Sequence, residues 1–194
     1  MEAASMKRFV PLLGVLLLGG LILYAMQDPE LGEVSPMAGK PVPDFQLTVL
    51  ESQTSAAFGM VDQHALMGKV QLLNVWASWC GVCRSEHDFL MSLEQQGLSL
   101  VGLNYRDKRQ AAMASLRELG DPYQTVIFDP QGKLALDLGV LGTPETLLID
   151  SQGIVRQRYV GALDKQVWQR YFVPVLEQLD SDVNHVTESK ESRS

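Results

Sequence analysis

The stretch KVQLLNVWASWCGVCRSEH, residues 69–87, contains the only two cysteines of the chain, Cys80 and Cys83. Its first part, residues 69–77, is apolar, rich in residues that favour β-structure, and preceded by Gly68. A continuous apolar run of this length is typical of a strand that is buried on both faces of a sheet. We therefore expect the cysteine pair to follow directly after a buried strand.

A helix is expected to begin at the cysteines. Phe89, Leu90 and Leu93 recur at the spacing of one helix face, and Gly97 is a typical stop signal at a helix C-terminus. The pair is therefore predicted to lie at the junction between a buried strand and a helix.

Strand and helix patterns continue to alternate after this helix. The expected elements are strands at 98–105, 124–129, 144–150 and 154–161, and helices at 107–120, 131–139 and 164–179. Asp107 is expected to cap the first of these helices, and Pro174 should kink or break the last one. The segment from 44 to Leu66 is expected to hold a short strand pair. This order predicts an α/β fold with a mixed central sheet and helices on both faces.

The cysteine pair allows three interpretations: a structural disulfide, part of a metal site, or a redox centre. Two cysteines are too few to stabilise a domain of this size by cross-linking. A tetrahedral metal site needs two more donors, and His87 is the histidine nearest to the pair in sequence. A Cys-x-x-Cys pair at a strand–helix junction is typical of a thioredoxin-like redox centre.

The position of the pair on the helix predicts a different role for each cysteine. Near the helix N-terminus, free amide groups and the helix dipole favour a thiolate at Cys80, and the thiolate is the attacking species. Cys83 lies three residues further along the same face, and we expect it one turn deeper. Cys80 would then attack a partner disulfide, and Cys83 would attack Cys80 to release the reduced partner.

Pro144 stands between a glycine-containing loop and a strand. One interpretation is an ordinary proline at a strand start, where a missing N–H does least harm. The other is a cis peptide bond, which would leave the backbone of Thr143 open to hydrogen-bond an extended peptide.

The N-terminal region predicts a membrane protein. Residues 9–26 are uncharged, follow Lys7 and Arg8, and as a helix would span about 27 Å, close to the thickness of a bilayer core. The positive charges predict that residues 1–8 are cytoplasmic and that the rest lies across the membrane. A cleaved signal peptide is the alternative, but a small-residue cleavage site is missing.

The remaining boundaries follow from composition. Residues 27–43 are expected to be a linker, 44–180 the folded domain, and 181–194 a disordered tail. The formal net charge of −7 disfavours a nucleic-acid partner.

Four motifs together resemble one known family: WASWCGVCRSEH, GLNYRD, LDLGVLGTPETLLID and VPDFQL. They are similar to the DsbE/CcmG family, the membrane-tethered thioredoxin-like proteins of bacterial cytochrome c maturation, over essentially the whole chain. The resemblance implies a thioredoxin-like fold with a strand–helix insert, at about 120–142, before a cis-proline. It also implies a periplasmic thiol:disulfide oxidoreductase that is anchored in the bacterial inner membrane and uses the Cys80–Cys83 disulfide without another cofactor.

The partners implied by the resemblance are apocytochrome c, whose haem-attachment cysteines would be reduced directly or through another maturation protein, and a transmembrane thiol reductase as the electron donor. Tethering would raise the effective concentration near such membrane-bound partners.

The resemblance also implies roles for single residues. Cys80 and Cys83 would carry out the exchange, Pro144 would provide the substrate-facing cis bond, and Trp79 would pack beside the nucleophile. Glu86 and Glu145 match acidic positions near the active site of the family.

A carboxylate near the pair could raise the thiol pKa or shuttle a proton. The alternative for Glu86 is a solvated residue in the first helical turn, stabilised by the helix dipole.

Two features depart from the family pattern. Gly81 and Val82 separate the cysteines, where a proline is common, and Thr143 stands where the family often has a small or apolar residue. The Thr143 hydroxyl could donate a hydrogen bond to a nearby sulfur.

Two other functions remain open on the same fold. One is a copper-binding or copper-delivery domain that would use the cysteines with His87. The other is a general periplasmic thiol oxidant, which runs the same chemistry in the opposite direction.

Overall fold

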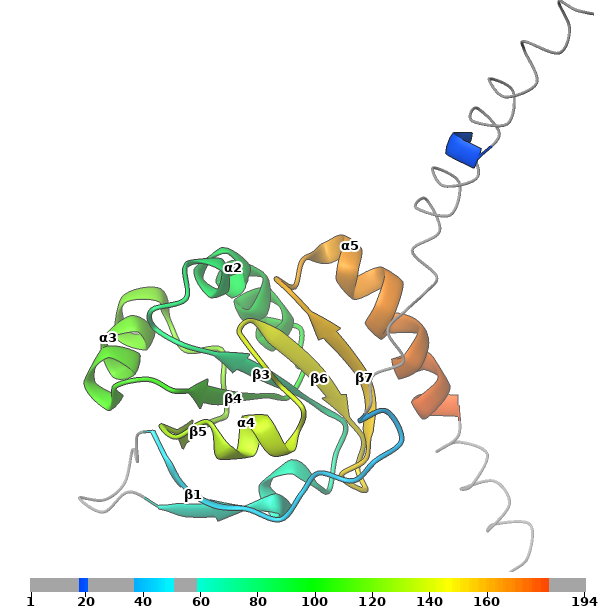
Figure 1. Cartoon of the computed structure of the whole chain (residues 1–194). Coiled ribbons are helices and arrows are strands. Elements are labelled where there is room, and N and C mark those ends of the chain that lie inside the picture. Colours follow the sequence, from blue (N-terminus) through cyan, green and yellow to red (C-terminus); the bar gives the residue numbers. More distant parts are fainter. Residues whose placement is uncertain (1–17, 21–36, 51–58, 182–194) are drawn as a thin grey trace, which may run out of the picture. The chain divides into compact units, whose positions relative to one another are not determined.

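The computed structural model describes residues 18–20, 37–50 and 59–181. Seven strands in this part of the chain form one sheet in the order β2-β1-β5-β4-β3-β6-β7 (Figure 1). The strands are β1 (Gln46–Val49), β2 (Met60–Asp62), β3 (Gln71–Trp76), β4 (Leu100–Tyr105), β5 (Thr125–Asp129), β6 (Glu145–Ile149) and β7 (Val155–Val160). The helices are η1 (Gln63–Leu66), α2 (Gly81–Gln95), α3 (Arg109–Leu119), α4 (Lys133–Asp137), α5 (Lys165–Val167) and η2 (Trp168–Phe172).

The sheet is mixed, as predicted. The central strands β3, β4 and β5 are parallel, whereas β6 runs antiparallel to β3, and β7 antiparallel to β6. At the other edge, β1 pairs antiparallel with both β2 and β5, which confirms the expected short strand pair near the N-terminal side of the domain.

Helices cover both faces of the sheet, and the side chains of β3 divide between two cores. Leu72 and Trp76 pack with α2, α3 and the C-terminal helical region. Leu73 and Val75 point to the opposite face, where α4 and η1 pack. All six residues of β3 are buried, so the apolar run identified in the sequence forms an inner strand of the sheet, between β4 and β6.

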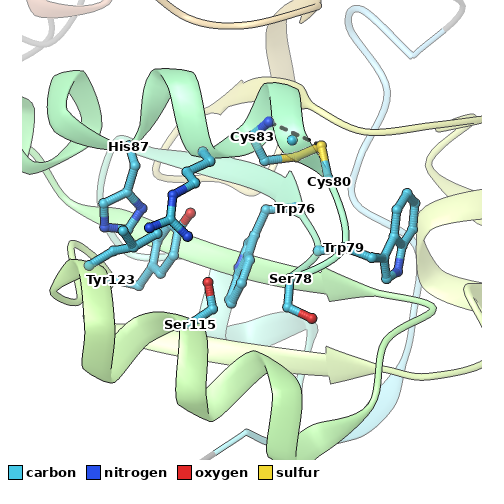
Figure 2. Close-up of a pocket in the computed structure, with 12 residues that line it drawn as sticks. Trp76, Ser78, Trp79, Cys80, Cys83, His87, Ser115 and Tyr123 are labelled. Carbon is cyan, nitrogen blue, oxygen red and sulfur yellow. Dashed lines mark hydrogen bonds between the residues drawn. A yellow bond between two sulfur atoms is a disulfide. The ribbon is translucent and has the colours of Figure 1, made fainter.

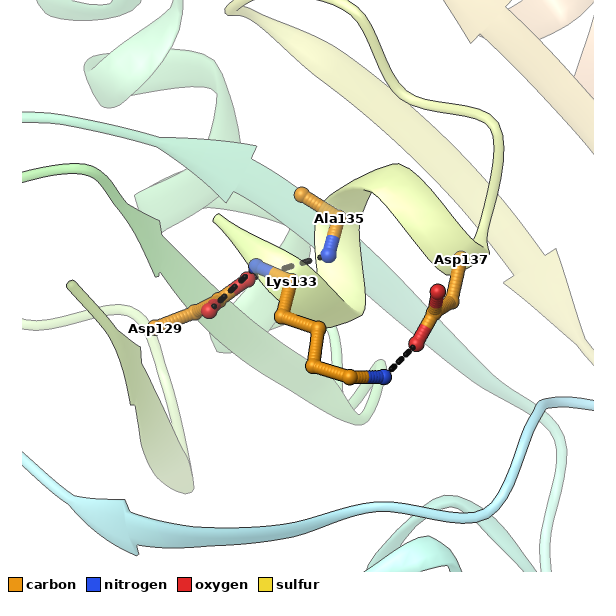
Figure 3. Close-up of polar contacts among 4 residues, drawn as sticks. All are labelled: Asp129, Lys133, Ala135 and Asp137. Atoms are coloured by element: carbon orange, nitrogen blue, oxygen red, sulfur yellow. Dashed lines mark hydrogen bonds and ion pairs between the residues drawn. The ribbon is translucent and has the colours of Figure 1, made fainter. Parts of the chain in front are cut away.

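The strand–helix insert predicted at about 120–142 is present as β5 and α4. Asp129 connects the two elements, because its carboxylate accepts hydrogen bonds from the backbone N–H groups of Lys133 at 2.9 Å and Ala135 at 3.0 Å (Figure 3). Lys133 also forms an exposed ion pair with Asp137 one turn later, at 2.6 Å. A helix of only five residues is not stable by itself. The buried Asp129 carboxylate therefore stabilises the start of α4.

The last helical region covers nearly the expected residues, 165–181, and is irregular before Pro174. It begins as α5, passes through the π-helical turn η2, and is helical again over 173–181. The backbone N–H of Val173 donates to the carbonyl of Trp168, five residues earlier. Because Pro174 follows directly and has no N–H, the disturbance predicted for this proline takes the form of a π-helical turn rather than a break.

The cap predicted at Asp107 is wrong. The N-cap of α3 is Lys108, which makes no side-chain capping bond. The Asp107 carboxylate is occupied elsewhere, mainly by Ser78 on the loop after β3.

The folded unit begins before the residue expected from the sequence. Residues 37–42, assigned there to the linker, pair with the chain around the start of β7: Gly39 N–H donates to Val155 O, and Val42 N–H to Gly153 O, both at 2.8 Å. Val42 is buried in the core on the α4 side. The chain divides into two compact units, residues 1–34 and residues 35–194.

The anchor expected at 9–26 lies outside the described residues, apart from 18–20, which are helical. No helix within 18–20, 37–50 and 59–181 has the length and apolar character needed to cross a membrane. The predicted cytoplasmic residues 1–8, most of the linker and the tail after 181 also lie outside the described part.

Candidate functional site

Cys80 and Cys83 form a disulfide in the first turn of α2, with their Cα atoms 5.3 Å apart. Cys80 is the N-cap of the helix, and its sulfur accepts a hydrogen bond from the backbone N–H of Cys83 at 3.0 Å. The two residues are almost equally buried, with exposed fractions of 8% and 7%. The depth difference expected between them is therefore absent, and the asymmetry lies in the N–H that points to the Cys80 sulfur.

This arrangement favours negative charge on Cys80 once the disulfide is reduced. The helix dipole and the Cys83 N–H both stabilise a thiolate at the N-cap position. The N–H of Cys80 itself donates to Ala77 O at 3.1 Å, which fixes the backbone that carries the sulfur.

A pocket of about 120 Å³ borders the disulfide. Figure 2 shows the disulfide at its edge, with Trp76 and Trp79 beside it and His87 and Tyr123 on the far side. The pocket lies between the first turns of α2 and the α3 side of the molecule. It is smaller than typical small-molecule sites, which have roughly 300–1,000 Å³.

The Thr143–Pro144 peptide bond is cis, as predicted. Glu145, the next residue, pairs with Val75 near the end of β3. The register therefore brings Pro144 opposite Trp76, at the end of the sheet from which the chain continues to the cysteines. Pro144 and the cysteine pair, which are about 60 residues apart in the sequence, thus lie at the same end of the sheet.

The hydrogen bond expected from Thr143 to a sulfur is absent. The Thr143 Oγ1 atom is buried and makes no hydrogen bond within the described residues. Both sulfurs are joined in the disulfide.

Glu86 is buried, with an exposed fraction of 1%, so the solvated first-turn residue considered from the sequence is not what the structure contains. Its carboxylate accepts hydrogen bonds from the side-chain amide of Asn74 at 2.9 Å and from the backbone N–H of Leu163 at 2.7 Å. Burial raises the pKa of Glu86 to about 7, although these two hydrogen bonds oppose the rise. Glu86 can therefore gain or lose a proton near neutral pH.

Asn74 holds this carboxylate within a larger buried network. Its amide group also donates to Thr146 Oγ1 at 3.1 Å, and its carbonyl oxygen accepts from the Tyr123 hydroxyl at 2.7 Å. Tyr123 stacks on Trp76, with ring centroids 5.8 Å apart, and burial raises its pKa well above the usual value. The network connects the core behind α2 to the pocket beside the disulfide.

Sequence reasoning did not find Asn74, Tyr123 or Thr146. Asn74 gave one signal, because it is a polar residue inside an otherwise apolar strand. Tyr123 and Thr146 gave none, since their roles depend on contacts with residues far away in the sequence.

Glu145 is buried, but it has a charged partner. Its Oε2 atom accepts from Arg158 Nε at 2.7 Å and lies 2.5 Å from Arg158 Nη2. Its other oxygen accepts from the N–H of Leu141 at 3.3 Å, while Arg158 donates to Gly139 O at 3.0 Å. The pair therefore ties the loop before the cis-proline to β6 and β7.

Trp79 lies directly before Cys80 and borders the pocket, but more than half of it, 59%, is exposed. Its indole N–H donates to Arg106 O at 3.1 Å. It is held in place by the neighbouring loop and presents a large apolar surface beside the disulfide.

His87, the candidate metal ligand, borders the same pocket. Its Nε2 atom lies 3.1 Å from Gly120 O, so this ring nitrogen is engaged with the backbone. Among the residues that the structure describes, no group of three or more His, Cys, Asp or Glu side chains is arranged around a common metal position.

Comparison with known proteins agrees with this geometry. The Redoxin family profile matches residues 37–172. The thiol:disulfide interchange protein DsbE of Yersinia pestis is 47% identical over 174 residues, which cover 86% of this chain and 90% of that protein. The DsbE of Escherichia coli K12 is 42% identical over 186 residues, covering 91% and 98%.

The chain belongs to the DsbE family of thiol:disulfide interchange proteins.

The solved structure of a DsbE protein from Chlorobium tepidum supports the fold assignment, with a TM-score of 0.59 and 31% identity over 75% of this chain and 96% of that one. The predicted thioredoxin-like fold is thereby confirmed. As a DsbE-family member with a Cys-x-x-Cys disulfide at the start of a helix, the protein is a thiol-disulfide oxidoreductase.

Proposed function

We propose that this DsbE-family protein is a reductase, which reduces the disulfide formed by the haem-attachment cysteines of apocytochrome c, or that of a maturation partner, on the periplasmic side of the inner membrane. The observation that carries the proposal is the Cys80 sulfur at the N-cap of α2, with the Cys83 N–H 3.0 Å away. A thiolate at this position is stabilised before any substrate binds.

The exchange runs in two steps. The Cys80 thiolate attacks one sulfur of the substrate disulfide, forming a mixed disulfide and releasing the other substrate sulfur as a thiolate that takes up a proton. Cys83 then loses its proton and attacks Cys80, which closes the Cys80–Cys83 disulfide and releases the second substrate thiol. Two electrons pass to the substrate, and a transmembrane thiol reductase would return two electrons to the protein.

We assign to Glu86 the role of accepting the proton that Cys83 loses in the second step. It lies three residues after Cys83 on α2, and residues at this spacing share a helix face. A carboxylate whose pKa is raised to about 7 can accept a proton from a thiol and return it at neutral pH. Because Glu145 is neutralised by Arg158, we assign it instead to holding the loop before Pro144.

The surface around the disulfide supports a polypeptide substrate rather than a small molecule. The adjacent pocket, of about 120 Å³, is smaller than typical ligand sites. Trp79, Val82 and Leu141 are large exposed apolar residues from the segments that flank the disulfide and the cis-proline. The cis bond at Thr143–Pro144 leaves a backbone segment to which an extended peptide can hydrogen-bond.

The proposed location depends on the sequence. The uncharged run at 9–26 after Lys7 and Arg8 supports a single membrane anchor with the domain on the periplasmic side. The family resemblance supports apocytochrome c or a maturation protein as the partner.

A trapping experiment tests the roles of the cysteines. The Cys83→Ser variant is mixed with an oxidised peptide that carries a Cys-x-x-Cys-His haem-attachment sequence, and the adduct is mapped by mass spectrometry. We expect a mixed disulfide through Cys80 that persists, while Cys80→Ser forms little adduct. Equal trapping by the two variants would contradict the assignment.

The reduction potential tests the direction of electron flow. A reductase should have a potential toward about −200 mV or below, whereas a strong oxidant lies near about −120 mV. Equilibration of the wild-type disulfide with glutathione buffers measures this value, and a potential near the oxidant value would overturn the proposed reductase.

A further inference from the structure

One carboxylate joins two loops beside the disulfide. Asp107 follows β4, and its Oδ2 atom accepts hydrogen bonds from the backbone N–H of Ser78 at 2.6 Å and from Asn104 Nδ2 at 3.0 Å. Its Oδ1 atom accepts from Ser78 Oγ at 2.8 Å and from the N–H of Lys108 at 2.7 Å. Ser78 lies only two residues before Cys80, so the carboxylate holds the segment that leads to the N-cap of α2.

A second bond holds the same segment. The indole N–H of Trp79 donates to the carbonyl of Arg106, the residue directly before Asp107, at 3.1 Å. Ser78 and Trp79 are therefore both attached to the turn at 106–108.

The turn itself is supported from behind by the β5–α4 insert. Arg106 has a left-handed backbone, with φ of 46°. Its N–H donates to Asp129 O at 3.0 Å, and its Nε atom donates to Gln131 O at 3.4 Å. Non-glycine residues adopt this conformation only where their surroundings impose it, so the insert keeps the turn in a fixed position.

We propose that Asp107 is a positioning residue for Cys80, which places the Cys80 sulfur at the helix N-terminus by holding Ser78 with a bidentate set of hydrogen bonds. The inference rests on the proposed role of Cys80 as the attacking thiol. It assigns to the turn at 106–108, and to the insert that supports it, a function in the chemistry of the disulfide.

Asp107 can affect the Cys80 sulfur because Ser78, which it binds, is only two residues away from Cys80 in the chain. The Cys80 sulfur meets the Cys83 N–H only if the N-cap residue keeps its extended backbone, and the Cys80 N–H is bonded to Ala77 O. Releasing Ser78 loosens residues 77–80 together. The Cys80 thiolate then loses part of the stabilisation that the helix start provides.

Positioning and simple charge have opposite effects, so they can be separated. If Asp107 acted only through its negative charge, neutralising it would favour the Cys80 thiolate. If it acts by positioning, Asp107→Asn disfavours the thiolate. The amide nitrogen of asparagine cannot accept hydrogen bonds, so some of the bonds from Ser78 and Asn104 are lost and the segment before Cys80 is held less firmly. Ser78→Ala removes one of the four bonds without any change of charge.

Asp150 provides a matched control. Its carboxylate also accepts backbone hydrogen bonds, from Gln152 at 2.8 Å and Ile154 at 2.9 Å, and binds Arg156 Nε at 2.6 Å. It follows Ile149, which pairs with the first residue of β3, so it lies at the end of the sheet away from the disulfide.

The experiment measures alkylation of the reduced full-length protein by iodoacetamide at a series of pH values, with Cys80 and Cys83 resolved by mass spectrometry. For Asp107→Asn we expect a higher midpoint pH for Cys80 and an alkylation rate at pH 7 that is lower by about fivefold, the equivalent of one hydrogen bond. Ser78→Ala should shift the midpoint in the same direction by less. Asp150→Asn should lower the melting temperature but leave the Cys80 profile unchanged.

Three results would overturn the inference: a lower midpoint in Asp107→Asn, an unchanged profile in Ser78→Ala, or an equal shift in Asp150→Asn. Should Asp107→Asn fail to fold, Ser78→Ala decides alone. Preferential alkylation of Cys83 in the wild-type protein is a separate outcome, which would contradict the proposed cysteine roles rather than the contribution of Asp107.

Discussion

The side-chain amide of Asn74 donates to the carboxylate of Glu86 at 2.9 Å, in a region from which water is excluded. An ionised carboxylate is costly to bury, and two donated hydrogen bonds offset only part of that cost. The protein therefore keeps a group that changes charge near neutral pH on the buried face of α2, the helix that carries the disulfide.

The first prediction concerns the pH dependence of stability. The pKa of Glu86 rises from 4.5 in the unfolded chain to about 7 in the fold. The folded state therefore binds the proton more tightly, and the free energy of unfolding should fall by about 3 kcal/mol as the pH rises from below 4.5 to above 7. Urea unfolding of the oxidised protein at pH 5 and pH 8 measures most of this difference.

Glu86→Gln should abolish most of that fall, because the amide does not ionise. Glu94→Gln, an exposed position on the same helix, is the matched control and should keep the wild-type slope. A Glu86→Gln variant with the same pH slope as the wild type would show that Glu86 does not titrate in this range.

The second prediction concerns the buried pair of Glu145 and Arg158. Arg158→Met should lower the free energy of unfolding by about 3–5 kcal/mol, because it leaves the Glu145 charge buried without its partner. The double variant Glu145→Gln/Arg158→Met should recover part of the loss. Lys133→Met breaks an exposed ion pair and should cost less than about 1 kcal/mol. Denaturant unfolding measures all three, and a small effect of Arg158→Met would contradict the structural role.

The third prediction uses Gly102, which lies beside Asn74 in the sheet. A Cβ atom at this position would lie 2.8 Å from Trp76 Nε1 and 3.0 Å from Tyr123 Cδ2. Gly102→Ala should therefore destabilise the fold by about 1–3 kcal/mol and disturb the stacking of the two rings, measured by thermal unfolding and near-ultraviolet circular dichroism. Gly81→Ala, where nothing lies within 4 Å of the added atom, should not lower the melting temperature.

The fourth prediction concerns the buried hydroxyl of Thr143. Because this group makes no hydrogen bond within the described residues, Thr143→Val should raise the free energy of unfolding by about 1 kcal/mol. Thr143→Ser keeps the hydroxyl and loses a methyl group, so it should not show this gain. A clear loss of stability in the valine variant would mean that the hydroxyl has a partner.

The strands, the helices and the disulfide could be predicted from the sequence because their signals are local. The apolar run at 69–77 and the helical spacing after it are enough to place Cys80 at a helix start. The cis bond before Pro144 could be predicted only with the help of the cysteine pair and the family resemblance, because the proline alone was equally compatible with an ordinary strand start.

Glu86 shows where residue type left two interpretations open. Its position falls on the same helix face as Cys83, Leu90 and Leu93, all of which are buried. The spacing thus contained the signal for burial. A carboxylate is usually exposed unless it has partners, and those partners, Asn74 and Leu163, come from other parts of the chain.

Asp107 shows a case in which the local sequence pattern predicted the wrong contact. Its place before a helix favoured a local cap, yet it binds Ser78, which lies 29 residues earlier. Only the parallel pairing of β3 and β4 brings the loops that follow these strands together. Local propensity could not reveal a contact that depends on this pairing.

The pairing of residues 37–42 with the start of β7 fixes the end of the sheet at which the chain enters the domain. Val155 faces Ile149, and Ile149 faces Gln71, the first residue of β3, whereas Cys80 follows the last residue, Trp76. The polypeptide thus enters the domain at one end of the sheet and the disulfide lies at the other, separated by about 17 Å of strand. Within the domain, a partner that binds at the disulfide therefore meets the loops after β3, β4 and the turn before β6, and not the segment at 37–42.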